Sequence, residues 1–130
     1  MSCIYTEDPE LPVIELRVLG RVTQHDMDEI LPKIEAFIAR HGKVRIVEVI
    51  EKFEGFDPTT MLDGIKFDIN HLSDVTHAAV VSDIGWIGML TRASAMIMPL
   101  TVRVYPMSEL ETARAWARDP QDMMPGAAAE

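Results

Sequence analysis

The sequence predicts a single α/β domain with a mixed sheet of about five strands and about four helices. Strand-like apolar runs alternate with segments whose apolar residues recur at helical spacing. The first two strand-like runs have only a short turn between them, which predicts an antiparallel hairpin. Charged residues interrupt the strands, so we expect one sheet face to be better covered than the other. The order ββαβαβαβα then requires a mostly parallel sheet with right-handed crossovers.

The N-terminal hairpin is predicted from a short apolar run at Cys3–Tyr5 and a longer run at Val13–Leu19. In the second run apolar and charged residues alternate, which is typical of a strand with one buried face. We expect Gly20 to end this strand.

The first helix begins at Thr23, whose hydroxyl can accept from a first-turn amide while Asp26 completes a capping box. Its apolar stripe runs to a stop at His41-Gly42, with Pro32 as a mild kink. The next strand, Val44–Ile50, is almost continuously apolar and therefore central in the sheet.

The segment Glu51–Asp57 is expected to be a loop. Asp57-Pro58 then reads as a helix start, with proline in the first turn, and this second helix should fray near Ser73. A strand of small residues follows at His77–Ser82.

The third helix is expected to be capped by Asp83 and to run to about Met98, since Pro99 forbids continuation. Leu100–Tyr105 reads as the last strand.

The last helix is expected to open with a capping box at Ser108 and Glu111 and to reach about Arg118. The domain therefore covers residues 1–118, and residues 119–130 read as a disordered tail.

The composition excludes several classes of function. The chain has 130 residues and a formal net charge of −9, which disfavours binding to nucleic acid or to an anionic membrane, because both depend on Lys and Arg. A single cysteine, Cys3, leaves no intramolecular disulfide and favours a cytoplasmic protein. No signal peptide or transmembrane segment is expected.

The sequence contains no convincing set of catalytic or metal-binding groups. The four histidines form no metal-binding motif, and Asp68 with His71 on the second helix reads as a solvated surface, so we expect no metal and no cofactor. Glu48 in the central strand is the most interesting carboxylate, but a cross-strand pair with Arg17 or Arg103 is the favoured interpretation. We therefore expect a protein that is not an enzyme.

The third helix, Ile84–Met98, is more apolar than one sheet face can bury. The surplus can complete the core with the Phe53–Phe56 loop folded over it, or it can meet an apolar ligand, a dimer partner or a membrane surface. One arginine, Arg92, is too little positive charge for firm membrane docking, so membrane contact is at most peripheral.

Several ordered blocks of residues 3–118 resemble the bacterial SpoIIAA-like family, also described as STAS/SEC14-like. These blocks are Val13–Gly20, Val22–Asp26, Val44–Gly55 with its Phe-Glu-Gly-Phe, Ala78–Val81 and Arg103–Trp116. The resemblance implies a small α/β domain related to anti-sigma-factor antagonists and to the lipid-binding Sec14 fold. It also implies frequent dimerisation, with ligand binding and membrane association proposed for the family.

Two hypotheses follow for the function. In the first, a homodimeric binding module takes a lipid-like or other apolar ligand between its second and third helices. The candidate pocket walls are Phe53, Phe56, Ile65, Trp86, Leu90 and Ile97. In the second, the domain is a partner-switching protein that binds a regulatory protein. Antagonists of the family carry a phosphorylated serine, whereas the equivalent stretch Phe53–Thr60 offers only Thr59 and Thr60, next to the opposing charge of Asp57.

Overall fold

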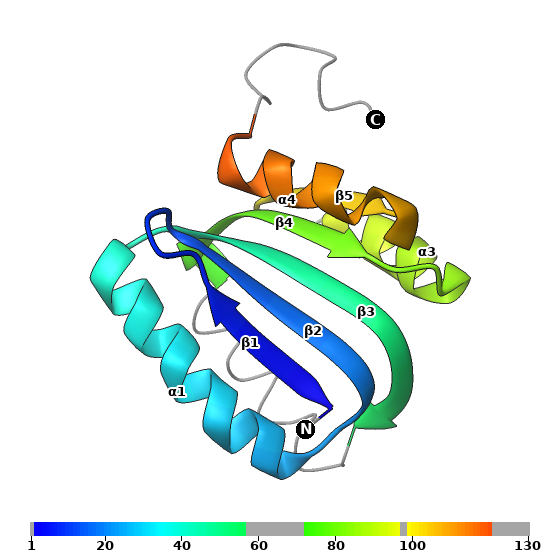
Figure 1. Cartoon of the computed structure of the whole chain (residues 1–130). Coiled ribbons are helices and arrows are strands. Elements are labelled where there is room, and N and C mark those ends of the chain that lie inside the picture. The colour runs from blue at the N-terminus through cyan, green and yellow to red at the C-terminus, as the bar shows by residue number, and fades with distance from the viewer. Residues whose placement is uncertain (1, 57–71, 97–98, 121–130) are drawn as a thin grey trace.

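The computed structural model of the protein describes residues 2–56, 72–96 and 99–120. Its centre is one five-stranded sheet in the order β1-β2-β3-β4-β5 (Figure 1). The strands are β1 (Cys3–Glu7), β2 (Val13–Val22), β3 (Val44–Phe56), β4 (Val75–Val81) and β5 (Thr101–Tyr105). β1 pairs with β2 antiparallel, and all other pairs are parallel. The predicted α/β class, mixed sheet and N-terminal hairpin are therefore confirmed.

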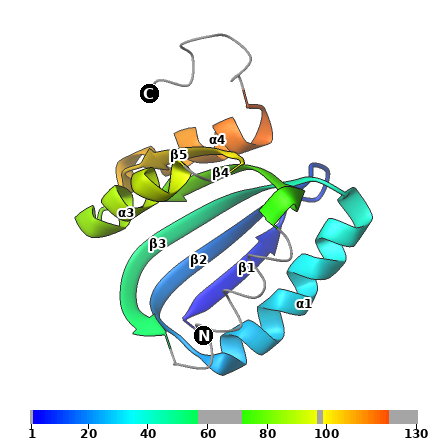
Figure 2. The ribbon, with the colours of Figure 1, turned by 180° about the vertical axis from the view of Figure 1, so that it is seen from behind.

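Three α-helices flank this sheet in the described part of the chain: α1 (Gln24–His41), α3 (Gly85–Ala95) and α4 (Leu110–Arg118). Right-handed crossovers between neighbouring strands place their helices on one face, so α1 and α3 share a face, and α4 lies on the other (Figure 2). The predicted second helix falls almost entirely on residues 57–71, outside the described residues. Residues 121–130 of the predicted tail also lie outside them.

The first helix begins and ends as the sequence predicts. The Thr23 hydroxyl accepts from the Asp26 amide at 3.2 Å, and the Asp26 carboxylate accepts from the Thr23 amide at 2.9 Å. At the other end, Gly42 adopts a φ of 81°, and its amide donates to the Ile38 carbonyl. α1 lies along β1 and β2 and packs on an apolar core whose largest fully buried side chain is Phe37.

The opposite face of the sheet is covered by the short helix α4. Its Ala113, Trp116 and Ala117 pack on a second core, which is formed by Val13, Val47, Val49, Ala79, Val81 and Tyr105. The Glu15 carboxylate accepts two hydrogen bonds of 2.8 Å from the Arg114 guanidinium. The Arg45 guanidinium donates to the Ala117 and Arg118 carbonyls at the end of α4. Charged residues inside the strands thus serve to fasten α4, which explains their position under a helix of only nine residues.

The turn between β1 and β2 is organised by Asp8. Its carboxylate accepts from the Glu10 and Leu11 amides at 2.9 Å each, and it also forms an ion pair with Arg118 of α4. These two backbone hydrogen bonds, helped by the arginine, hold the pKa of Asp8 below its usual value. The hairpin turn and the end of α4 are therefore joined.

Two strands are longer than the sequence predicts. β2 continues through Gly20 to Val22, because Gly20 pairs with Phe53 of β3 and does not begin a turn. A Cβ at Gly20 would lie 2.9 Å from the Glu54 carboxylate, so the glycine permits a close approach of side chain to strand. The sequence also predicts a loop at Glu51–Asp57. This prediction is wrong for residues 51–56, because β3 continues to Phe56.

Two predicted helix caps are also wrong. A 3₁₀ turn at Met107–Glu109 precedes α4, which starts at Leu110 without a side-chain cap, so Ser108 and Glu111 form no capping box. The Asp83 carboxylate accepts instead from the Met107 amide at 2.9 Å. It therefore ties the start of α3 to the start of α4.

Among the described helices, none combines the length and apolar character needed to cross a membrane.

Candidate functional site

The outward side of α3 carries the largest exposed apolar side chains of the described residues. Trp86 is 53% exposed, Met89 69%, Leu90 60% and Met96 86%. These four residues are called the apolar face of α3 below. Met96 follows the last residue of α3 and lies in a turn, in which the Met96 amide donates to the Ala93 carbonyl.

Helical spacing places Trp86, Met89 and Leu90 on one side of α3, because at about 100° per residue these three positions fall within an arc of about 100°. Met96 lies in the turn that follows the helix. The opposite side of α3 packs on the sheet through Ile87, which is buried, and Gly88, where an added Cβ would contact Val104 of β5. The helix is therefore apolar on both sides, as its sequence predicts, and only one side is covered by its own sheet.

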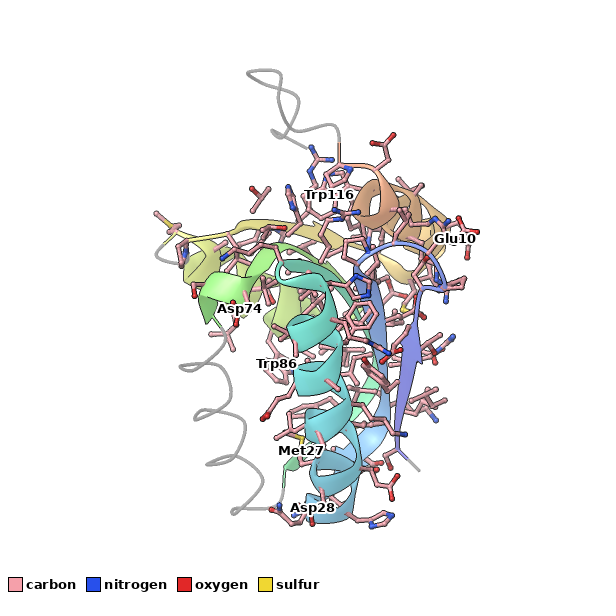
Figure 3. All side chains as sticks on the ribbon, turned by 90° about the vertical axis from the view of Figure 1, so that its left-hand side faces the viewer. Glu10, Met27, Asp28, Asp74, Trp86 and Trp116 are labelled. Carbon is pink, nitrogen blue, oxygen red and sulfur yellow. The ribbon has the colours of Figure 1, made fainter. Side chains whose placement is uncertain are left out.

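An aromatic pair connects the apolar face of α3 to the end of β3. The rings of Trp86 and Phe53 lie 5.8 Å apart at 59° to each other, and Phe53 also packs against the α1-side core. Both residues lie where parallel strands end, which is the edge at which open α/β sheets commonly bind ligands. Trp86 and Trp116 lie on opposite sides of the sheet (Figure 3).

The start of α3 is fixed by polar contacts. The Ser82 hydroxyl donates to the Ile50 carbonyl at 2.8 Å and accepts from the Ile84 amide at 3.1 Å. Together with the contact from Asp83 to Met107, these bonds hold the turn between β4 and α3 on the sheet. Trp86 therefore stands at a defined position relative to Phe53.

The charge of α3 differs from that of the whole chain. The helix contains no acidic residue and one basic residue, Arg92, while the chain carries a formal net charge of −9. The four side chains of the apolar face are uncharged, so an apolar ligand that covers them removes no charged group from water.

The structure brings together part of the predicted ligand set. Phe53 and Trp86 are in contact, and Leu90 lies one turn along the same helix face. Phe56 is the last residue of β3, but its side chain is not among those that the structure describes. Ile65, Ile97, Thr59 and Thr60 lie outside the described residues. Sequence reasoning left Met89 and Met96 out of the ligand set, although their helical spacing from Trp86 and Leu90 was the signal that could have included them.

Two hollows of about 200 and 320 Å³ lie elsewhere, on either side of the β1–β2 turn. Both are lined by Glu7, Asp8 and Pro9, and among the ligand residues that the structure describes, Phe53, Trp86 and Leu90 line neither hollow. Their arginines are occupied by neighbouring carboxylates, as Arg114 is by Glu15 and Arg40 by Glu7. The sequence contained no pattern that predicted these hollows.

In the described part of the chain, neither Cys3 nor the metal-ligating residue types show a reactive arrangement. Cys3 is buried, and burial together with the nearby Asp26 carboxylate raises the pKa of its thiol to about 11, the opposite of an activated nucleophile. Within the same residues no three His, Cys, Asp or Glu side chains gather into a metal-binding group.

Glu48 does not form the cross-strand pair that the sequence suggested. It lies in register with Leu16 and Val80, on the sheet face that carries α1 and α3. Arg17 pairs with Glu51 at 2.7 Å, and Arg103 stacks on Trp116 of α4, so both arginines belong to the opposite face.

Comparison with known proteins identifies the fold. A family model described as SpoIIAA-like matches residues 13–118. The crystal structure of an uncharacterised DUF3478-family protein with a SpoIIAA-like fold, from Shewanella loihica PV-4, superposes with a TM-score of 0.69. Its sequence is 16% identical, and the alignment covers 88% of this chain and 91% of that one. No curated protein matches the chain.

Proposed function

The chain belongs to the SpoIIAA-like family, and we propose that it is a non-enzymatic binding module for a lipid-like or other apolar small ligand. The ligand lies on the apolar face of α3, beside the Phe53–Trp86 pair. The observation that supports the proposal is the exposure of Trp86, Met89, Leu90 and Met96 on α3 and the turn after it, while the other side of the helix is already packed on the sheet.

The energetics favour a ligand of modest size. A ligand that covers about 300 Å² of apolar surface gains about 7.5 kcal/mol before the costs of association are subtracted, at about 25 cal/mol per Å². Large, contiguous apolar patches on soluble proteins mark interaction sites. The unbranched thioether side chains of Met89 and Met96 adapt to apolar ligands of different shape.

Other parts of the proposal rest on the sequence. Phe56, Ile65 and Ile97 complete the predicted ligand set, and the homodimer and the cytoplasmic location come from the resemblance and from cysteine usage. Contact with a membrane is at most peripheral, because Arg92 is the single cation of α3 and the chain is acidic.

The two tryptophans provide the test. Trp116→Phe leaves Trp86 as the single tryptophan, and Trp86→Phe leaves Trp116, which is buried between α4 and the sheet. We expect titration with palmitate to shift the emission of the Trp116→Phe variant to shorter wavelength, because the ligand removes Trp86 from water. The Trp86→Phe variant should show no such shift.

Native mass spectrometry of protein purified from cells supplies an independent measurement. A co-purified mass that Trp86→Ala weakens would support the proposal. Absence of any co-purified mass, together with unchanged Trp86 emission in palmitate, would contradict it.

The partner-switching alternative stays a prediction, because Thr59 and Thr60 lie outside the described residues. An added mass of one phosphate, mapped to either threonine in protein from cells, would favour it over ligand binding.

A further inference from the structure

The four methionines that the structure describes fall into two classes. Met27 packs against the α1-side core, and Met107 packs against the α4-side core. Met89 and Met96 are 69% and 86% exposed, and both belong to the apolar face of α3. As whole residues, Met89 and Met96 are therefore more exposed to solvent oxidants than Met27 and Met107, which are partly buried against the cores.

Their position places these two thioethers inside the proposed ligand site. Met89 is about one helical turn from Trp86, and Met96 lies in the turn directly after the C-terminal end of α3. A chemical change at either sulfur alters the surface that contacts the ligand. It leaves both cores intact, because neither side chain is buried in the fold.

We propose that Met89 and Met96 are oxidation sites through which hydroperoxides lower ligand binding at α3. The thioether sulfur attacks one peroxide oxygen, the O–O bond breaks, and the products are methionine sulfoxide and water, or an alcohol from an organic hydroperoxide. Sulfur loses two electrons and the peroxide gains them. Thiol-dependent reduction returns the thioether, releases water and leaves the thiols as a disulfide, so the change is reversible.

The effect on binding follows from polarity, and it depends on the proposed function. A sulfoxide is a strong hydrogen-bond acceptor, and an apolar ligand that covers it removes water from it without replacing the hydrogen bond. Two sulfoxides on one small apolar face should weaken binding about tenfold or more.

The experiment treats the full chain with graded hydrogen peroxide and maps the oxidised residues by peptide mass spectrometry. We expect Met89 and Met96 to react at least about tenfold faster than Met27 and Met107, because oxidation follows exposure. Palmitate affinity is then measured before and after treatment by native mass spectrometry. Wild-type protein should lose affinity about tenfold and regain it after treatment with methionine sulfoxide reductase.

Matched variants separate the α3 methionines from the others. The Met89→Leu/Met96→Leu protein keeps an apolar face of similar size that peroxide cannot oxidise, so its palmitate affinity should not change on treatment. The Met27→Leu/Met107→Leu protein should lose affinity as the wild type does.

The outcomes distinguish this inference from the proposed function. If untreated wild type binds no palmitate, both fail. If it binds palmitate but the four methionines oxidise at equal rates, or the Met89→Leu/Met96→Leu protein loses affinity like the wild type, the inference is wrong while the proposed function stands. Unchanged affinity of the oxidised wild type would also overturn the inference alone.

Discussion

The link between the β1–β2 turn and α4 can be tested by replacing Asp8 with asparagine and with alanine. The Asp8 carboxylate is 7% exposed, accepts two backbone hydrogen bonds, and pairs with Arg118, whose side chain is 52% exposed. Alanine removes both kinds of contact. Asparagine keeps a carbonyl oxygen for the two amides and removes only the charge.

The magnitudes follow from these contacts. Each backbone hydrogen bond contributes about 1 kcal/mol. The pair with a half-exposed arginine contributes at most about 1 kcal/mol after solvent screening. We expect the free energy of unfolding to fall by about 2–3 kcal/mol in Asp8→Ala and by about 1 kcal/mol in Asp8→Asn. With an m-value of about 1.5 kcal/mol/M in urea, the unfolding midpoints fall by about 1.5 M and about 0.7 M.

The dependence on pH gives the sharper measurement. Because the folded-state pKa of Asp8 lies below its unfolded value of about 3.9, its charge stabilises the fold above that value. This contribution is lost as the pH falls through the folded pKa. The wild type should therefore lose its advantage over Asp8→Asn between about pH 5 and pH 2, with urea unfolding followed by Trp116 emission in a Trp86→Phe background. A gap between wild type and Asp8→Asn that stays constant over this range would refute the reasoning.

Three further predictions concern single contacts. Thr23→Ala should lower stability by about 1 kcal/mol by removing the α1 cap, and Thr23→Ser should restore most of it; thermal unfolding that gives the same midpoint for both variants would contradict the capping geometry. Phe37→Ala should cost about 3–5 kcal/mol, measured by urea unfolding, because it opens a cavity in a closed core; a loss below about 1 kcal/mol would mean that the site collapses. The Cys3 thiol should react with iodoacetamide at pH 8 at least about a hundredfold more slowly than in 8 M urea, and equal rates would show that β1 leaves the sheet freely.

Local chemistry made the first helix predictable from sequence. Thr23, Asp26 and Gly42 act on backbone groups within a few residues, so their spacing alone defines where α1 begins and ends. The alternation in Val13–Leu19 likewise placed Ile14 and Val18 on one face and Glu15 on the other: the two apolar residues lie in the α1-side core, and Glu15 pairs with Arg114 of α4.

Predictions that depended on distant partners were less successful. Gly20 looks like a strand end, but its neighbours are Phe53 and Glu54 of β3, which lie more than thirty residues later in the chain. Ser108 and Glu111 match a capping box, but the contact of Met107 with Asp83 belongs to a 3₁₀ turn that delays the helix. Such pairings are set by tertiary contacts, which local patterns do not contain.

The candidate site was predictable in one respect. The sequence contained more apolar residues in the third helix than a single sheet face can cover, and Trp86, Met89, Leu90 and Met96 are exposed accordingly. The partner of Trp86 was also within reach, since Phe53 was placed among the pocket walls. The two hollows beside Asp8 depend on how the β1–β2 turn meets α1 and α4, which no short motif specifies.

The sequential order of the strands has a consequence for synthesis on the ribosome. Each new strand emerges with its hydrogen-bonding neighbour already outside the tunnel, so the sheet can grow by one strand at a time from the N-terminal hairpin. The second core is different, because Ala113, Trp116 and Ala117 come last and Val47 and Val49 come much earlier. A nascent chain halted before Leu110 therefore exposes the apolar sheet face of the second core to chaperones and to other chains. At this stage the chain is most prone to aggregate.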